Sequence, residues 1–474
     1  MEAYWNYVLQ FGLDIRPDKM AFDTSALRYR KEETAMLLGN RVRIVLALCA
    51  FAIAGLTATP SSADLQKYVS KPEPSFEWQL KNKIEQSGDG IYDLQFVSQV
   101  WQSKKWQHQL QIYRPADIVP NATMFLWVTG GAATPQTISL GTELARKIKA
   151  PVAFVYHIPN QPLLEGNLRE DDLIAETFVR YLKSEDESWP LLFPMVKSVI
   201  KAMDVLQAFG KKEWSAPVNK FIVAGASKRG WTTWLTAAVD KRVGAIAPVV
   251  IDALNMREQM PRQLQAFGAY SSRLAAYSSR GLLPIPETPA GQRLLNMVDP
   301  WAYRDRLTMP KLIINGTNDF YWATDALNLY WAGIPNDKWV LYIPNAGHNL
   351  RRQDRPQREQ LNDLITGLAA FSRHQISGAP MPSLRWKHDT VNGKLRLTVD
   401  ATPAPTGARL WIAQAATPDL RTAQWRAQEV SFSDGKIFGE VTPPEKGHLA
   451  FFGELDYEIN GLRYHLSTQV RMTE

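Results

Sequence analysis

The segment Phe221-Ile-Val-Ala-Gly-Ala-Ser-Lys-Arg-Gly-Trp231 decides the fold of this chain. An apolar run ends here in a turn of small residues with Ser227 at its apex, and a segment of helical periodicity follows at once. A strand, a sharp turn and a helix in this order expose a serine as a nucleophile. The pattern is G-x-S-x-x-G, because Arg229 stands where a second glycine is usual. A serine that only caps the helix is the alternative interpretation.

Short apolar runs and segments of helical periodicity alternate on both sides of this turn. We predict strands at residues 123–129, 152–157, 220–224, 245–251, 311–315 and 339–343. We predict helices at residues 137–149, 171–183, 190–209, 229–240, 324–331 and 357–374. Continuously apolar strands between helices are typical of a parallel sheet that is buried on both faces. The pattern therefore predicts an α/β fold with its site at the carboxyl edge of the sheet.

The pattern changes at both ends of this α/β region. A hairpin of two amphipathic strands, residues 91–101 and 106–113, precedes it. A break at residues 377–382 (SGAPMP) follows it, and the rest of the chain contains strand and turn signals without a helix. We predict an α/β domain over residues 64–376 and a small all-β, sandwich-like module over residues 383–474.

Composition excludes several classes of protein. The 474 residues are 45% hydrophobic and 21% charged, which excludes a disordered or fibrous chain. The net charge of +7 is scattered, so we expect no nucleic-acid partner. One cysteine, Cys49, allows no intramolecular disulfide and no cysteine-rich zinc site. No P-loop, dinucleotide-binding GxGxxG or HExxH motif occurs, so we predict neither a cofactor nor a metal.

The N-terminal segment predicts export. Residues 44–56 (IVLALCAFAIAGL) follow basic residues and precede a stretch of small residues, as in a secretory signal. The run is shorter than the ~20 residues that span a bilayer. We predict that Met36 is the true start, that cleavage follows Ala63, and that no membrane span remains in a periplasmic or secreted protein. A membrane-anchored form that keeps the segment is the alternative.

Two polar residues that follow downstream strands complete a candidate triad with Ser227. Asp319 comes after the strand-like run KLIIN, and His348 comes after WVLYI. The chain order of serine, acid and histidine is that of α/β-hydrolases. Asp252, which also follows a predicted strand, is the second candidate for the acid.

Other residues are candidates for the oxyanion hole and the substrate pocket. The amide of Lys228 would point at a developing oxyanion from the helix N-terminus. The diglycine after residues 123–129 offers the amide of Gly131 or Ala132 as a second donor, although a simple tight turn explains it too. The pocket candidates are Tyr156, His157, Arg229, Trp322 and Asp252.

The acidic stretch Glu170-Asp171-Asp172 opens a predicted helix. Its favourable interaction with the helix dipole explains it without any catalytic role. The alternative is that it holds a basic side chain such as Arg229, or a cationic substrate.

Seven segments together carry a resemblance to a known family: WVTGGA, IPNQPL, REDDLIAETFVRYL, GASKRGWTTWL, VVIDALNM, INGTNDFYW and PNAGHNL. From about Tyr68 to the C-terminus the chain resembles the PhoPQ-activated pathogenicity-related (PqaA-type) proteins of the α/β-hydrolase superfamily. The resemblance implies an exported, virulence-associated bacterial hydrolase whose production is linked to a two-component system. The implied triad is Ser227, Asp319 and His348. The elbow also resembles that of glucuronoyl esterases, which implies that the cationic side chain of Lys228 assists the oxyanion.

These observations favour an exported serine hydrolase that cleaves an ester or amide bond in a small molecule, a glycan or a peptide. A non-catalytic envelope binding protein on the same scaffold and a carbohydrate esterase acting on acylated or uronoyl sugars are the alternatives. The sequence leaves the substrate and the oligomeric state open.

Overall fold

The computed structural model describes residues 65–86, 89–118, 122–335, 337–433 and 435–473. The predicted start at Met36, the secretory signal and the cleavage after Ala63 lie outside the described residues. Within these ranges, no helix combines the length and the apolar character that crossing a bilayer requires.

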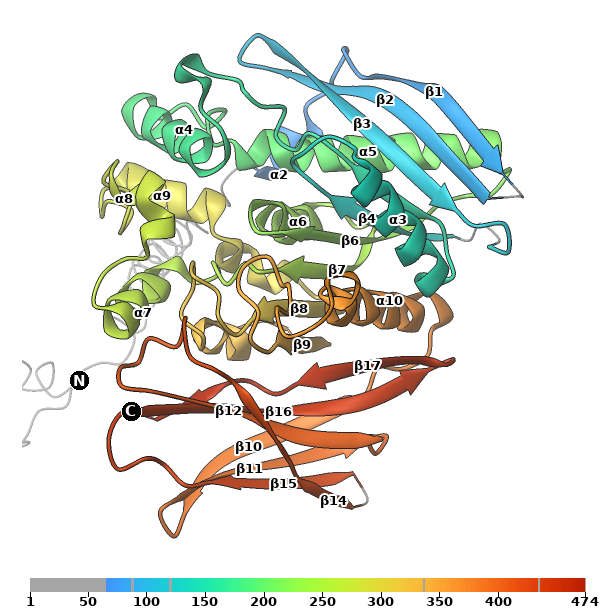
Figure 1. Ribbon diagram of the computed structural model, residues 1–474. Helices are drawn as coiled ribbons and strands as arrows, with labels where there is room; N and C mark the ends of the chain where they lie inside the picture. The colour runs from blue at the N-terminus through green and yellow to red at the C-terminus, as the bar shows by residue number, and fades with distance from the viewer. Residues whose placement is uncertain (1–64, 87–88, 119–121, 336, 434, 474) are drawn as a thin grey trace, which may run out of the picture. The chain divides into compact units, whose positions relative to one another are not determined.

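Six parallel strands form the centre of the main sheet, in the order β5-β4-β6-β7-β8-β9 (Figure 1). Their bounds are β4 Thr123–Val128, β5 Val152–Val155, β6 Lys220–Ala226, β7 Val243–Val249, β8 Lys311–Gly316 and β9 Lys338–Ile343. All six coincide with predicted strands. The antiparallel strands β1 (Glu77–Gln86), β2 (Asp89–Trp101) and β3 (Lys104–Arg114) extend one edge of this sheet. The predicted α/β-hydrolase fold is confirmed.

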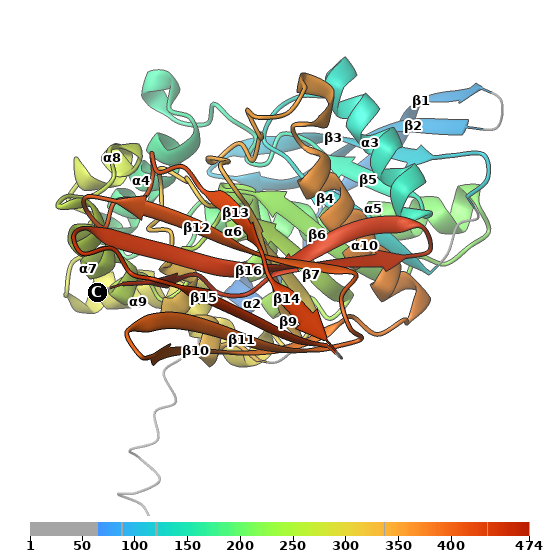
Figure 2. The same ribbon diagram turned by 60° about the horizontal axis from the view of Figure 1, so that its bottom comes forward.

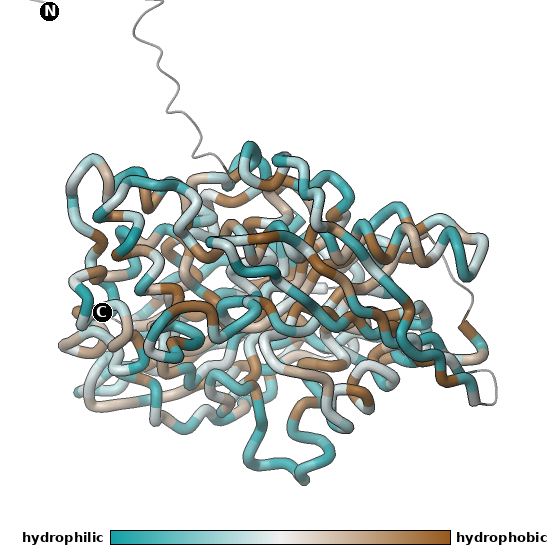
Figure 3. The backbone as a smooth tube through the Cα atoms, turned by 90° about the horizontal axis from the view of Figure 1, so that it is seen from above, coloured by the Kyte–Doolittle hydropathy of each residue, from teal (hydrophilic) through white to brown (hydrophobic). Residues whose placement is uncertain are grey.

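Helices cover both faces of the sheet, because successive strand residues point to opposite sides. In β6, Phe221 and Val223 join one hydrophobic core, while Ile222 and Ala224 join the other. The helices of the first core include α2 (Leu65–Ser70), α5 (Leu192–Glu213) and α6 (Lys228–Val239), and those of the second are α3 (Pro135–Ile148) and α10 (Asn362–Ser377). The loops at the periphery of the view from above are coloured mainly as hydrophilic (Figure 3).

A helical cap separates β7 from β8 in the sequence. It contains α7 (Met256–Phe267), α8 (Ala275–Ser278) and α9 (Pro289–Val298), with short 3-10 turns between and after them. The cap lies beside α4 (Glu170–Ser184), which contacts both α8 and α9 (Figure 1). These cap helices lie outside the predicted helices.

The C-terminal strands form two packed layers (Figure 2). Strands β17 (Leu462–Ser467), β16 (His448–Ile459), β12 (Gly407–Ala415) and β13 (Arg426–Glu429) continue the main sheet beyond β9. Strands β10 (Ser383–Val391), β11 (Lys394–Thr402), β15 (Lys436–Val441) and β14 (Ser431–Ser433) form a second sheet. Apolar residues of both layers, such as Leu397 and Phe451, share one core. The all-β character predicted for this region is confirmed.

Two local predictions differ from the structure. Strand β1 lies outside the predicted strands, although Trp78 and Leu80 alternate with polar residues as in a half-buried strand. Residues 324–331 contain the 3-10 turn Ala326–Leu329 and the first residue of a second one, Trp331–Gly333, instead of the predicted helix.

Candidate functional site

Ser227 occupies a strained turn between β6 and α6. Its backbone has φ 55° and ψ −124°, a conformation that residues other than glycine rarely adopt. The turn is tight, because a Cβ at Gly225 would lie 2.8 Å from the carbonyl carbon of Arg229 and one at Gly230 would lie 2.7 Å from Ile251. The two glycines therefore allow the close approach that presents the serine at the carboxyl end of β6.

Arg229 anchors this turn to α4. Its guanidinium forms two hydrogen bonds to Glu170, of 2.6 and 2.7 Å, and a third of 2.6 Å to the carbonyl of Ile158. It packs where a Cβ of Gly130 would lie, 1.6 Å from Nη2. Burial alone would raise the pKa of Glu170, but the hydrogen bonds and charge of Arg229 outweigh this effect and lower it to about 2.

Lys228 forms a second ion pair with the same acidic turn. Its Nζ donates to Asp171 Oδ2 at 3.0 Å and lies 3.4 Å from Glu170 Oε2. The other oxygen of Asp171 accepts from the Tyr277 hydroxyl of α8 at 3.1 Å. The acidic turn thus binds the elbow cations as well as opening the helix, and it ties both to the cap. The Lys228 amide stays a candidate oxyanion donor, while its ammonium group is paired with a carboxylate.

His348 and Asp319 meet at the ends of β9 and β8. His348 Nδ1 donates to Asp319 Oδ2 at 2.7 Å, since an ionised carboxylate only accepts. Asp319 Oδ1 accepts from the backbone amide of Tyr321 at 2.7 Å, which fixes the carboxylate. The bond through Nδ1 leaves Nε2 of the imidazole as the nitrogen that can take up a proton.

Tyr321 connects the histidine to the cavity that Ser227 opens into. Its ring stacks on that of His348, with centroids 4.2 Å apart and planes at 32°. Tyr321, Trp322 and Ser227 all line one cavity of about 440 Å³ beneath the cap. Tyr321 is not among the predicted site residues, although its place two residues after the candidate acid is a usable signal.

The serine and the histidine are not hydrogen-bonded in this structure. Across the described residues, the Ser227 hydroxyl has no hydrogen-bond partner, whereas His348 is bonded to Asp319. Catalytic hydrogen bonds are often long without substrate and tighten in the complex. Asp319 and His348 are thus bonded directly to each other, and Tyr321, which stacks on His348 and lines the cavity, links this pair to the Ser227 cavity.

The loop after β4 lies beside the elbow, because Val128 pairs with Gly225 in the parallel ladder. Gly131 and Ala132 are exposed in this loop. The Gly131 carbonyl accepts from the amide of His157 at 3.2 Å, so His157 supports the loop through its backbone.

Asp252 is buried beside the candidate acid but does not contact His348. The Tyr330 hydroxyl donates to its Oδ1 at 2.5 Å, and Asn315 Nδ2 donates to its Oδ2 at 2.8 Å. Burial raises the pKa of Asp252 to about 7, although these hydrogen bonds oppose the rise and the nearby charge of Asp319 adds to it. Asp319 is therefore the acid that the structure places on the histidine.

Of the pocket candidates, Trp322 lines the cavity and the other four lie elsewhere. Tyr156 is fully buried, and its hydroxyl bonds to Tyr113, Gln111 and Thr137 on the α3 side of the sheet. Arg229 is occupied by Glu170, Asp252 is enclosed below the site, and His157 supports the loop after β4.

Two asparagines attach the acid and histidine loops to the C-terminal region. Asn318 Nδ2 donates to Ala423 O at 2.7 Å and lies 3.3 Å from the carbonyls of Leu420 and Arg421. Asn345 makes a reciprocal pair with the backbone of Trp425, at 2.9 and 2.7 Å. We call residues 420–425 the clamp segment. Neither asparagine is among the predicted site residues, because the partners of both lie 80 or more residues away.

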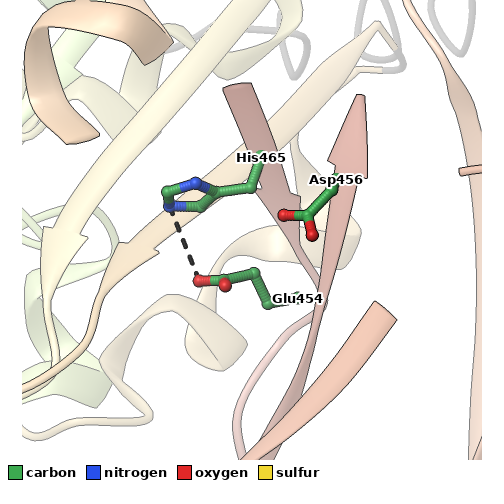
Figure 4. A group of neighbouring side chains, drawn as sticks. All are labelled: Glu454, Asp456 and His465. Atoms are coloured by element: carbon green, nitrogen blue, oxygen red, sulfur yellow. Dashed lines mark ion pairs between the residues drawn. The ribbon is translucent and has the colours of Figure 1, made fainter. Parts of the chain in front are cut away.

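One group of side chains in the described ranges has the spacing of a metal site: Glu454, Asp456 and His465 (Figure 4). The guanidinium of Arg409 forms ion pairs with both carboxylates, at 2.6 Å to Glu454, and His465 Nε2 lies 3.5 Å from Glu454. The positive charge of the Arg409 guanidinium already neutralises both carboxylates, so we interpret the group as an ion-pair cluster.

Replacing Ser227 by glycine should release backbone strain. We expect Ser227→Gly to be more stable than Ser227→Ala by about 1 kcal/mol, because only glycine adopts this φ and ψ without a steric penalty. Chemical denaturation of the two variants measures the difference. Equal or lower stability of the glycine variant would contradict the strain.

Removing the Asn345 side chain should loosen the clamp segment. Asn345→Ala leaves two backbone groups of Trp425 without partners, so we expect the free energy of unfolding to fall by about 1–3 kcal/mol. Hydrogen exchange should accelerate at residues 344–350 and in the clamp segment. Gln414→Ala, an exposed change in β12, is the control and should alter neither. Unchanged hydrogen exchange in Asn345→Ala would show that Asn345 does not hold the clamp segment.

Neutralising Asp252 should flatten the pH dependence of stability. Its pKa is about 7 in the folded protein and near 3.8 when unfolded, so the folded state retains a proton that the unfolded state loses. The proton on Asp252 stabilises the folded state fully below pH 4, and this stabilisation is lost as the pH rises through 7. We expect Asp252→Asn to gain stability relative to wild type between pH 5 and 8. Parallel melting-temperature curves for the two proteins would refute this.

Comparisons with known proteins show which relatives, solved structures and family the chain is similar to. A curated relative, autocrine proliferation repressor protein A of Dictyostelium discoideum, is 30% identical over 453 residues, which cover 88% of this chain and 89% of that protein. Acetyl xylan esterase from Paenibacillus sp. R4 aligns with a TM-score of 0.47 at 14% identity, covering 65% of this chain and 94% of that one. Glucuronoyl esterase from Solibacter usitatus gives 0.40 at 12%, covering 66% and 92%. The family model described as PhoPQ-activated pathogenicity-related protein matches residues 65–421, and the chain belongs to this family.

Proposed function

We propose that this protein is an exported serine hydrolase that cleaves an ester or amide bond. Ser227 is the nucleophile, His348 the general base and Asp319 the acid that orients the imidazole. The observation that carries the proposal is the strained backbone of Ser227, at a strand–helix turn that opens into a cavity. Strain of this kind persists where the surrounding structure enforces it, and it clusters at active sites.

The reaction runs in two halves. Ser227 Oγ attacks the carbonyl carbon while His348 Nε2 takes the hydroxyl proton, and a tetrahedral oxyanion forms. Collapse of this intermediate breaks the bond to the leaving oxygen or nitrogen, which receives the proton from Nε2. Water then attacks the acyl carbon while His348 Nε2 takes one of its protons. Collapse of this second intermediate breaks the bond to Ser227 Oγ, which receives the proton from Nε2, and the acid product leaves.

The oxyanion is held by backbone amides in this proposal. The Lys228 amide lies at the N-terminus of α6, and the Gly131 or Ala132 amide lies in the loop beside the elbow. The loss of one such donor typically lowers kcat by about 10²–10³-fold. The paired ammonium group of Lys228 keeps its side chain directed to the acidic turn.

The export part of the proposal rests on the apolar segment at residues 44–56. The Dictyostelium relative is named an autocrine proliferation repressor, and export of the present chain agrees with that name.

A non-catalytic binding protein is the second candidate function. The absence of a hydrogen bond from Ser227 among the described residues favours it, since a binder needs the cavity but no aligned base. The two candidates differ in whether Ser227 reacts.

A fluorophosphonate probe tests the proposal. We expect wild-type protein to be labelled at Ser227, and Ser227→Ala to lose all labelling. Asp319→Asn should slow hydrolysis of an activated ester by about 10³–10⁴-fold, because the imidazole loses its orienting partner. Mass spectrometry of the labelled peptide identifies the site.

The matched control is Ser139→Ala, an exposed serine on α3, which should be labelled like wild type. Circular dichroism and melting temperature establish that each variant is folded. Folded wild-type protein that neither reacts with the probe nor turns over any ester would exclude the hydrolase and favour the binding protein.

A further inference from the structure

The cavity at Ser227 has walls that are predominantly apolar. It is lined from the cap by Met260, Leu274 and Leu282, and from the main domain by further apolar side chains, namely Phe178, Trp231 and Ile251. All six are at most 7% exposed, so the surface they present is part of the hydrophobic core. Ligand pockets of a few hundred Å³ with such walls and few polar groups bind apolar ligands.

The two charged groups of the cavity that are closest to Ser227 in the structure are paired with each other. Lys228 and Asp171, at the Ser227 end, neutralise each other at 3.0 Å, and Tyr277 donates to the remaining oxygen of Asp171. The other charged lining residues, Arg257, Glu258 and Glu287, are exposed and lie at the rim. A charged substrate group inside the cavity would lose its hydration without gaining a counter-ion.

The mouth of the cavity is also partly apolar. Leu264 of α7 lines the cavity and is 44% exposed, so apolar surface faces solvent beside the cavity. An apolar group that passes Leu264 buries the exposed surface of this leucine as well as the group's own surface.

We propose that this cavity binds a linear or aryl apolar group of the substrate, attached either to the scissile carbonyl or to the leaving oxygen. The proposal rests on the function of Ser227 given above and names the class of ester on which it acts. The volume of 440 Å³ equals on the order of fifteen water-sized groups of about 30 Å³ each, so a chain of several carbons fits.

Two series of neutral esters test the proposal with the full chain. The first keeps a p-nitrophenyl leaving group and lengthens the acyl part from acetate to octanoate. The second keeps the acetyl group and lengthens the alcohol from ethyl to octyl. We expect kcat/KM to rise in one series by up to about fourfold per methylene until the cavity is full. The series that responds identifies which half of the ester occupies the cavity.

Filling the cavity should remove this preference. For the eight-carbon ester of the series that responds, we expect Met260→Trp and Leu283→Trp to lower kcat/KM at least tenfold. For the shortest ester of the same series, we expect kcat/KM to change less than threefold. Ile84→Trp, at a position on β1 that is 53% exposed, is the matched control and should leave the chain-length profile unchanged. Equal rates across both series in wild type, with turnover that still depends on Ser227, overturn the apolar site and leave the hydrolase intact.

A binding measurement separates this proposal from the proposed function. We expect Ser227→Ala to bind octan-1-ol by calorimetry more tightly than butan-1-ol, and Met260→Trp to abolish the difference. Binding of this kind without turnover of any ester by wild type supports the apolar site and overturns the hydrolase. Absence of any chain-length dependence in binding overturns the apolar site.

Discussion

Two buried cations beside one acidic turn organise the candidate site. Lys228 and Arg229 are each 8% exposed, and a buried cation without a partner would cost several kcal/mol. Glu170 and Asp171 supply the partners from the first turn of α4. These ion pairs fix the elbow against α4, and the hydrogen bond from Tyr277 to Asp171 attaches the cap to the same point. The position of the serine and one wall of its cavity therefore depend on a single electrostatic arrangement.

This arrangement also explains how a strained residue persists. The conformation of Ser227 costs on the order of 1–3 kcal/mol, which the chain tolerates only if neighbouring contacts leave no alternative. On one side the β6 ladder fixes Gly225, and on the other Arg229 is held by three hydrogen bonds. The guanidinium also needs the bare backbone of Gly130, so the diglycine that suggests an oxyanion loop has a packing role as well.

Local patterns predicted the strands and the acid–histidine pair, while contacts between distant segments escaped prediction. Asp319 and His348 follow strands whose apolar runs are plain in the sequence, and parallel strands bring such ends together. Tyr156 also follows a strand, but its side chain points to the α3 side, an orientation that periodicity alone did not assign. The cap helices contain proline and glycine and interrupt the alternation of strands and helices. The asparagine contacts of the clamp segment have no local signature at all.

The site is thus held from two independent directions. The acidic turn of α4 restrains Ser227 and the cap, whereas the clamp segment restrains Asp319 and His348 through Asn318 and Asn345. Tyr321 lies between the two groups, because it bonds to Asp319, stacks on His348 and lines the cavity of Ser227. Alignment of a serine with its base requires both restraints, since an error of about 1 Å can cost a hundredfold in rate. In the proposed mechanism, the C-terminal region therefore contributes by holding the loop of the base through the clamp segment, and none of its described residues lines the cavity.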